Sequence, residues 1–465
     1  MTSKDNASNY IWLLSISFLY AIISMAAARE IIIPSIFPLA LDGDMPGDPV
    51  YYKTIAMEAA AKIRAYGITA FDSHPNGQGI AGVASLAYLT TKHTYGIIVL
   101  NAVIHAFSAL LLALIARQWF SQITAIVCTM PMISSPYMML WFSQINKESF
   151  ALNGVLAITL GVLRILQKSS SASLKSNVAS LLLILIGSFF VWLVRPYINQ
   201  LIFYVVAAIF LMAIAWRLRS LCISKPVPII QFAFLGAIAA SMLAILSTGA
   251  TSDATIQNFF EFEKPKNSEN IDVPTLTNTC LQKVGSSKWK NLDFLPNHVN
   301  DRLKALMGQR CLIFSILETH KDSTTLRSIV DQDRLPAGSL EALLYLPRAA
   351  ILGIFSPLPT YWSYAIIDRG SFFYAITSVE AVIFYIGIVS LLLWIVRTRN
   401  FSALVPVAIS IFVMTLYGMA IPFVGALYRY RYPWWILLLC LGIAALFSLL
   451  TRDETHAKQS LNNSK

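Results

Sequence analysis

Charged residues are scarce in this sequence. Only 13% of its 465 residues are charged and 56% are hydrophobic, whereas about a quarter of the residues in a soluble globular protein are charged. This shortage excludes a soluble enzyme, a disordered tail and a coiled coil. Cysteine is also sparse, since five residues are too few for a disulfide-built scaffold. The sequence has no nucleotide-binding glycine loop, no dinucleotide fingerprint and no His/Cys zinc spacing, which argues against nucleotide-driven transport and redox chemistry.

Long apolar runs are abundant instead. A run of about 20 apolar residues crosses a bilayer core of about 30 Å. Runs of this kind lie at residues 10–28, 95–116, 121–140, 150–166, 179–194, 198–216, 228–248, 376–396, 402–424 and 433–450. They predict an all-α polytopic membrane protein with about ten transmembrane helices.

The basic residues predict its orientation. Lys and Arg outnumber Asp and Glu by 35 to 24, a net charge of +11. If the N-terminus is cytoplasmic, the clusters around Arg117, Arg164, Arg217 and Arg397 all fall on the inside, as the positive-inside rule requires. This predicts cytoplasmic N- and C-termini in a bacterial inner membrane and a periplasmic active site. The same rule accounts for the basic excess, so nucleic acid is not an expected partner.

Two segments on the predicted periplasmic side are far longer than the usual connection of about 4–6 residues. The first, residues 29–94, belongs to an N-terminal transmembrane module over 1–248. The second, 249–374, holds 12 acidic and 11 basic residues between Asp253 and Glu341, which predicts a soluble periplasmic subdomain. Residues 375–465 then form a C-terminal transmembrane module and a cytoplasmic tail.

The second long segment contains two further features. Cys280 and Cys311 lie outside the predicted spans and cytoplasmic loops; in an oxidising compartment we predict a disulfide between them, with two free thiols as the alternative. Residues 340–362 are apolar but are interrupted by Pro347. Counting them as a span would place Arg397 outside, so we predict a helix in the outer interface or a re-entrant segment.

The first long loop opens with three carboxylates, Asp42, Asp44 and Asp48. After Pro49 the apolar residues recur at helical spacing, which predicts an amphipathic helix lying on the membrane surface. Its apolar face comprises Tyr52, Ile55, Ala56, Ala59, Ala60 and Ile63. Asp48 stands at the expected N-cap, so one interpretation is a helix cap. The other is a carboxylate that deprotonates an acceptor hydroxyl or holds a metal ion.

The spacing of Asp48, Tyr52 and Ala56, four residues apart on a juxtamembrane helix after the first span, resembles the GT-C glycosyltransferase superfamily. The nearest pattern is that of the protein O-mannosyltransferase and aminoarabinose transferase group. Near the C-terminus, Tyr428–Pro433 resembles the Arg-Tyr-Arg-x-Pro element that opens the last span in many bacterial members. The large soluble insertion before the last spans also agrees with this group.

A histidine downstream bears on the same resemblance. His74-Pro75 is similar to the start of the His-Pro-Pro-Leu stretch of the group, but Asn76 and Gly77 stand where the second Pro and the Leu would be. By itself a lone histidine is more often a surface or hydrogen-bonded residue than a catalytic one. His74 is therefore a candidate only within the resemblance.

The resemblance implies an inverting glycosyltransferase that moves a sugar from a polyprenyl phosphate or diphosphate to a glycan, lipid or protein acceptor in cell-envelope assembly. It implies that a first-loop carboxylate acts as the base, with Asp48 matching best and Asp44 and Asp42 in reserve. Carboxylates suit a base and a divalent metal ion equally, so the sequence names no certain cofactor and leaves the metal open. Membrane lipids are the other expected partners.

Lys147 and Glu148 occupy a short predicted outer turn between two spans. Their plainer interpretation is an interfacial salt bridge. Alternatively, Glu148 is a second carboxylate or metal ligand, and Lys147 contacts the donor phosphate. Tyr52 is placed with Lys147 among the predicted substrate-binding residues.

Arginines at the other outer turns are predicted to bind the donor phosphate. Arg195, Arg429 and Arg431 run against the positive-inside bias, and a guanidinium fork suits a phosphate bidentately. The alternative is that these side chains snorkel to lipid head groups. Arg348 is a weaker candidate of the same kind.

Two other functions stay open at this point. An O-antigen or polysaccharide polymerase or ligase would share many spans, a large outer loop and outer arginines. A transporter of lipid-linked oligosaccharide would need charges along a path through the membrane, and the predicted spans are nearly free of charged residues.

Overall fold

The computed structural model describes residues 3–36, 43–45, 47–91, 94–167, 174–221, 289–319, 329–331, 334–359 and 371–451, with a few single positions between 236 and 241. Over these residues the secondary structure is helical, apart from two isolated β-bridges. The predicted all-α class is therefore confirmed. The chain divides into two units, each described by itself below. Unit 1 comprises Met1–Phe262, Ile383–Ile409 and Ile436–Lys465, and unit 2 comprises Glu263–Val382 and Ser410–Trp435.

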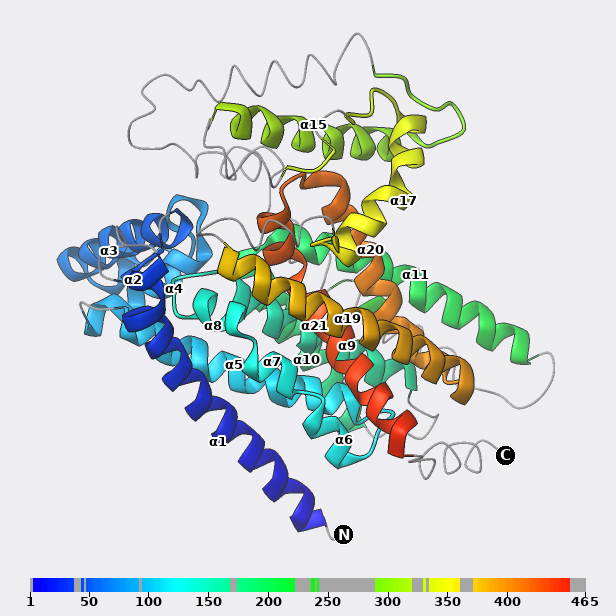
Figure 1. The fold of residues 1–465 in the computed structure, drawn as a ribbon, viewed down its shortest axis with the longest axis horizontal. Helices are drawn as coiled ribbons and strands as arrows, with labels where there is room; N and C mark the ends of the chain where they lie inside the picture. The colour runs from blue at the N-terminus through cyan, green and yellow to red at the C-terminus, as the bar shows by residue number, and fades with distance from the viewer. Residues whose placement is uncertain are drawn as a thin grey trace. The chain divides into compact units, whose positions relative to one another are not determined.

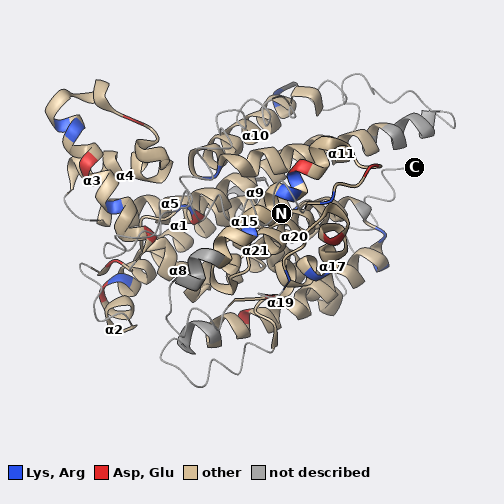
Figure 2. Ribbon diagram, turned by 90° about the horizontal axis from the view of Figure 1, so that it is seen from above, with Lys and Arg blue, Asp and Glu red and all other residues tan. Residues whose placement is uncertain are grey.

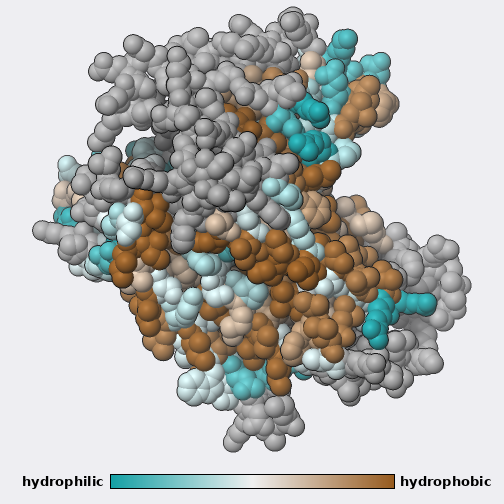
Figure 3. Space-filling view, viewed as in Figure 1, coloured by the Kyte–Doolittle hydropathy of each residue, from teal (hydrophilic) through white to brown (hydrophobic). Residues whose placement is uncertain are grey.

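Unit 1 begins with a long apolar helix. Helix α1 (Ser3–Ala27) continues through a π-helical turn, η1 (Ala28–Ile32), into α2 (Ile33–Ile36). Several large apolar side chains on α1 are exposed, among them Trp12 and Ile23. In Figure 3 apolar side chains cover the visible faces of α1 and α19. Such faces suit contact with lipid rather than water.

The remaining helices of unit 1 pack beside α1. Figure 1 shows α5 alongside α1, with α3 and α4 at one end of α1. The bounds are α3 (Asp48–Tyr66), η3 (Ile68–Ala70), η4 (Pro75–Gly77), α4 (Gly79–Thr90), α5 (Tyr95–Ala116), α9 (Glu148–Gln167), α10 (Leu174–Val194) and α11 (Pro196–Leu221).

Helix α3 has the amphipathic character that the sequence predicts. Its buried residues are Pro49, Tyr52, Ile55, Ala56, Ala59, Ala60 and Ile63. Figure 2 shows charged residues of both signs along the same helix. The apolar face contacts α4 and belongs to one buried cluster with α4 residues. Protein therefore covers this face, and the location of α3 at the membrane surface stays a prediction.

The apolar run 121–140 is broken into three short helices, α6 (Gln122–Val127), α7 (Met130–Ser134) and α8 (Pro136–Phe142). The two parts Gln122–Ser134 and Pro136–Phe142 are bent by 62°. Proline removes a helical hydrogen bond and clashes with the preceding turn, and Ser135 caps the new helix through Met138 N–H. The predicted straight span is thus a bent pair.

Within the part of the chain that the structure describes, six helices are long and apolar enough to cross a membrane, or seven if the bent pair counts as one span, as expected for a multi-pass membrane protein. They are Ser8–Ile36, Tyr95–Ala116, Glu148–Gln167, Lys175–Val194, Ala375–Thr398 and Val424–Thr451. The predicted spans 198–216 and 402–424 correspond to the shorter apolar helices Pro196–Met212 and Leu404–Ala420. Most of 228–248 lies outside the described residues. The described residues therefore show a multi-pass membrane protein, and the count of about ten spans stays a prediction.

Unit 2 contains α15 (Asn297–Thr319) and α17 (Ser339–Phe355), together with parts of α19 (Ser371–Thr398), α20 (Leu404–Ala420) and α21 (Val424–Thr451); η7 (Phe401–Ala403) precedes α20 in unit 1. Helix α17 overlaps the predicted interfacial segment 340–362 and is one continuous helix despite Pro347. Cys311, on α15, is disulfide-bonded, while its predicted partner Cys280 lies outside the described residues.

Two β-bridges join distant segments of unit 2. Lys290 pairs with Gly338, just before α17, and Ile329 pairs with Phe423, just before α21. Arg310 of α15 is completely buried and donates hydrogen bonds to three backbone carbonyls, those of Val330, Gly418 and Met419. Because buried carbonyls need donors, this arginine holds the C-terminal end of α20 against α15.

Candidate functional site

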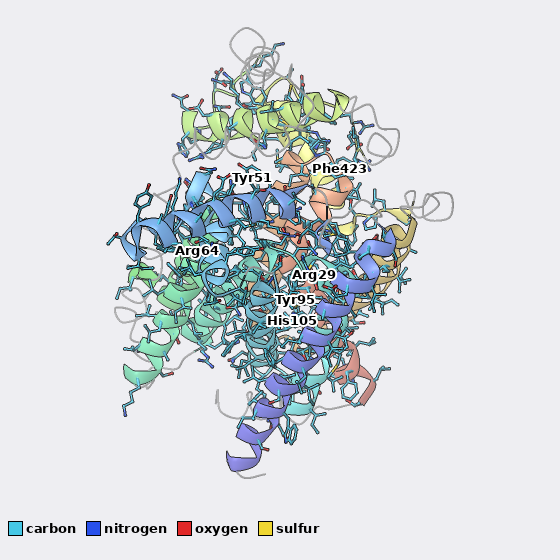
Figure 4. The ribbon with its side chains drawn as sticks, turned by 90° about the vertical axis from the view of Figure 1, so that its left-hand side faces the viewer. Arg29, Tyr51, Arg64, Tyr95, His105 and Phe423 are labelled. Carbon is cyan, nitrogen blue, oxygen red and sulfur yellow. The ribbon has the colours of Figure 1, made fainter. Side chains whose placement is uncertain are left out.

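Polar side chains gather at one end of the unit 1 helices, where three chain segments meet. These are the loop and helix after α1, the turn between α8 and α9, and the junction of α10 with α11. We call the residues Asp44, Asp48, Tyr52, His74, Asn146, Lys147, Glu148 and Arg195 the polar cluster. Figure 4 shows Arg29 toward the upper end of α1 and Tyr51 on α3 above it.

Asp48 is the first residue of α3. The cap position is Gly47, whose φ of 97° is in the region that favours glycine, so the predicted N-cap role of Asp48 is displaced by one residue. A carboxylate in the first turn of a helix is stabilised by the helix dipole. Asp48 lies one turn before Tyr52 on the same face, and the Lys147 ammonium is 5.1 Å from the centre of the Tyr52 ring. Asp48 is half-buried, one helical turn from the ring that the Lys147 ammonium faces.

Asp44 has a different environment. Its Oδ1 is 2.7 Å from Arg29 Nη1 and its Oδ2 is 2.6 Å from Lys53 Nζ. The side chain is buried, and Arg29 reaches it from the π-helical turn η1. Both oxygens of Asp44 therefore join the end of α1 to α3, which leaves this carboxylate poorly placed to accept a substrate proton. The third predicted carboxylate, Asp42, lies outside the described residues.

Gln144 fastens the Asp44 segment to the turn that follows α8. Its Oε1 accepts a hydrogen bond from Met45 N–H, and its Nε2 donates to the carbonyl of Gly43, each at 3.1 Å. Asn101 of α5 in turn donates to the carbonyl of Gln144. The first loop and the 143–148 turn are therefore one connected structure.

Glu148 and Arg195 form a buried ion pair. Arg195 Nη2 is 2.7 Å from Glu148 Oε1, and the two side chains are 2% and 0% exposed. Glu148 begins α9 and Arg195 follows the last residue of α10, so the pair joins the two helices at one end. The helices approach closely there, since a Cβ on Gly154 would lie 2.7 Å from the Gly187 carbonyl oxygen. Glu148 therefore forms a buried salt bridge with Arg195, a partner that the sequence did not predict.

His74 lies in the loop before α4. Its Nδ1 is 3.0 Å from Ser73 Oγ, and its ring meets the ring of Trp192 edge-on at 4.5 Å. Burial lowers the pKa of His74 below its ordinary value, so the ring is neutral at pH 7. Gly79 makes this approach feasible, because a Cβ there would overlap the carbonyl of Leu193.

Asn146 was given no role from the sequence. It is 1% exposed, and neither atom of its side-chain amide has a hydrogen-bond partner in the structure. Other polar side chains of the same turn are engaged: Ser143 donates to a carbonyl within α8, and Ser149 donates to Asn101. The available signal was a polar stretch, Ser143 to Glu148, between two apolar runs.

The remaining predicted arginines belong to unit 2. Arg431 is fully buried and donates to the carbonyls of Gly353, at 2.8 Å, and Ser356. Its guanidinium also lies over the rings of Tyr428 and Trp435. These contacts are those of a structural arginine. Arg429 is half-buried and lies 5.8 Å from the centre of the Tyr430 ring.

Arg348 is bound to a carboxylate. Its Nε and Nη2 each donate to Asp331 at 3.0 Å, and Tyr345 donates to the same carboxylate at 3.0 Å. Burial acts to raise the pKa of Asp331, but these hydrogen bonds and the charges of Arg348 and Arg310 outweigh it, so the pKa lies below its ordinary value. Arg348 is therefore committed to this pair.

Metal ligation and similarity to known proteins give no further assignment. Among the described residues, His, Cys, Asp and Glu form no group of three that could hold a metal ion. No protein family, curated protein or solved structure matches the chain. Function is therefore inferred from the chemistry of the polar cluster and from the sequence resemblance.

Proposed function

We propose that this protein is an inverting glycosyltransferase of the GT-C type, which moves a sugar from a polyprenyl phosphate or diphosphate to an acceptor hydroxyl. The observation that carries the proposal is the position of Asp48, half-buried in the first turn of α3 and one turn before the Tyr52 ring that the Lys147 ammonium faces. The other described carboxylate of this loop, Asp44, joins α1 to α3 through Arg29 and Lys53.

The reaction needs both the negative charge of Asp48 and the positive charge of Lys147. A bond forms between the acceptor oxygen and the anomeric carbon as the bond from that carbon to the phosphate oxygen breaks. Asp48 takes the hydroxyl proton as general base, and the Lys147 ammonium stabilises the charge on the departing lipid phosphate. Among the predicted phosphate-binding cations, Lys147 is the one that faces the Tyr52 ring, one turn after Asp48. Arg195 acts by holding Glu148 and the turn that carries Lys147.

The proposal includes the topology predicted from the basic residues. It has about ten spans across a bacterial inner membrane, cytoplasmic termini, a periplasmic subdomain within 249–374 and the polar cluster on the periplasmic side. Reporter fusions after Arg117 and Arg399 are expected to give a cytoplasmic signal, and a fusion near Ser287 a periplasmic one. A cytoplasmic signal at Ser287 would overturn the assignment of the active-site face.

Two matched substitutions test the catalytic role. Purified protein in lipid nanodiscs is given undecaprenyl phosphate-linked sugars and an envelope-glycan acceptor fraction, and release of undecaprenyl phosphate is measured. Asp48→Asn keeps the size of the side chain, so we expect folding to survive and the rate to fall by about 10²–10⁴-fold, the usual loss for a positioned base.

Asp44→Asn is the control. It leaves Arg29 and Lys53 without their shared carboxylate, so we expect a lower unfolding temperature and a rate loss that follows the loss of folded protein. Wild-type turnover in Asp48→Asn would contradict the assignment of Asp48. Failure of the wild type to release undecaprenyl phosphate from any donor would contradict the glycosyltransferase function.

A further inference from the structure

The Asn146 amide is an exception within its surroundings. Buried polar groups in folded proteins nearly always have hydrogen-bond partners, and a group without one opposes folding. In the turn between α8 and α9, Ser143, Gln144, Glu148 and Ser149 all engage protein atoms. Asn146 alone in this turn has an enclosed side chain with neither amide atom bonded in the structure. A ligand that supplies the missing partners would explain its presence.

The chemistry of the amide narrows the class of ligand. An asparagine side chain offers two N–H donors and a carbonyl oxygen with two lone pairs. A phosphate or carboxylate supplies acceptors only, and a polyprenyl chain supplies neither donors nor acceptors. Sugar hydroxyls supply both, and neighbouring hydroxyls of one ring can pair with both ends of an amide.

The position of Asn146 narrows the class of ligand further. Asn146 directly precedes Lys147, so their Cα atoms are about 3.8 Å apart. In a sugar phosphate the hydroxyls lie within a few bonds of the phosphate. A lipid-linked sugar whose phosphate is held by Lys147 therefore has hydroxyls within reach of this turn. We propose that Asn146 binds the hydroxyls of the donor sugar and selects which sugar is transferred. This inference rests on the proposed function.

Enclosure of the amide requires a movement when the sugar arrives. The adjacent Lys147 is half-buried, and its ammonium lies over the Tyr52 ring. The proposal requires this long side chain to turn from the ring toward the donor phosphate and so to open the turn around Asn146. Donor binding is thus coupled to exposure of Asn146.

The proposal predicts that replacing Asn146 raises or preserves folding stability but lowers the affinity for a sugar-bearing lipid. Asn146→Leu keeps the number and branching of the side-chain heavy atoms and removes both orphaned polar atoms, so the ligand-free protein is expected to unfold at the same or a higher temperature than the wild type. Asn146→Ala is the second variant, in case leucine fits poorly. The affinity of both variants for a sugar-bearing lipid is expected to fall by roughly 10- to 100-fold, the effect of losing two hydrogen bonds.

Asn153→Ala is the matched control. Asn153 is also a buried asparagine of unit 1, but its amide donates to the Ile104 carbonyl and to Ser108 Oγ. Its removal takes away two buried hydrogen bonds. We expect a lower unfolding temperature and unchanged lipid affinity, the reverse of the pattern for Asn146.

The experiment measures the rise in unfolding temperature as lipid is added to the purified full-length protein. The probes are undecaprenyl phosphate alone and undecaprenyl phosphate carrying glucose, mannose, N-acetylglucosamine or aminoarabinose. We expect one sugar-bearing lipid to bind the wild type more tightly than undecaprenyl phosphate, and the Asn146 variants to lose that advantage while still binding undecaprenyl phosphate.

Several outcomes would overturn the proposal. If the sugar gives no advantage in the wild type, or if the Asn146 variants retain it, Asn146 does not read the sugar, while binding of undecaprenyl phosphate leaves the proposed function standing. If both Asn146 variants unfold at a lower temperature with unchanged affinity, the amide has a structural partner such as an internal water. If no lipid stabilises the wild type, the inference and the proposed function fail together.

Discussion

The ion pair between Glu148 and Arg195 allows a sharp test of how unit 1 is held together. Glu148→Gln removes the charge but keeps the shape, and it leaves a guanidinium that is 2% exposed without its carboxylate. Removing one partner of a buried pair costs about 3–5 kcal/mol of folding stability, because the other charge stays buried. Loss of a carboxylate from the first turn of α9 adds about 0.3–1 kcal/mol through the helix dipole.

A double variant distinguishes a structural role of the ion pair from a role of Arg195 in phosphate binding. Replacing both residues by Met removes the two charges together, and such replacements are often neutral or stabilising. We expect Glu148→Met with Arg195→Met to recover most of the stability lost by either single change, and to retain affinity for undecaprenyl phosphate.

The reactivity of two buried thiols measures the unfolding of unit 1. Cys128 and Cys440 are free and completely buried in unit 1, so a thiol-reactive fluorophore reports the unfolding of this unit. Cys222, which lies outside the described residues, is replaced by serine to limit the background. A single variant that unfolds like the wild type would refute the energetic reasoning. A double variant that is stable yet unable to bind undecaprenyl phosphate would show that Arg195 binds phosphate, as the sequence first predicted.

Two further predictions concern other contacts. The pKa of Asp331 is held below its ordinary value of 3.8, so the pair with Arg348 stabilises the fold at neutral pH, and this stabilisation is lost as the pH falls through the lowered pKa. In thermal unfolding measured between pH 6 and pH 2, Arg348→Met should lose less stability on acidification than the wild type. An equal loss of stability in both proteins would contradict the role of the pair. Gly79→Ala should lower the unfolding temperature, because its methyl group overlaps the Leu193 carbonyl, and an unchanged temperature would show that α4 can move away without penalty.

Sequence periodicity was enough to predict the elements but not their partners. The apolar positions of α3 recur at helical spacing, so its buried face could be named from Tyr52 to Ile63. What covers that face could not be named, because α4 and a bilayer offer the same apolar surface. The bend before α8 had a signal in Pro136, since proline interrupts helical hydrogen bonding, but the apolar composition on both sides favoured one span.

In the candidate site, too, the sequence predicted the residues but not their partners. The outer carboxylates and cations could be found as charges interrupting apolar runs, but charge gives no pairing. Glu148 lies next to Lys147 in sequence and yet binds Arg195, 47 residues away, because the approach of α9 to α10 decides the distance. Asn146 was missed for a related reason: an unsatisfied amide is a property of what surrounds it in space, which no local spacing encodes.

The glycine contact between α9 and α10 has a consequence for the biogenesis of the protein. Gly154 and Gly187 let two apolar helices that are neighbours in sequence touch backbone to backbone, and this contact lies close to the ends that carry Glu148 and Arg195. A carboxylate or a guanidinium is expensive to transfer alone into a membrane, whereas an ion pair is nearly neutral as a whole. The two helices are therefore expected to leave the protein-conducting channel together as a closed hairpin, with the charge of each compensated before either meets lipid.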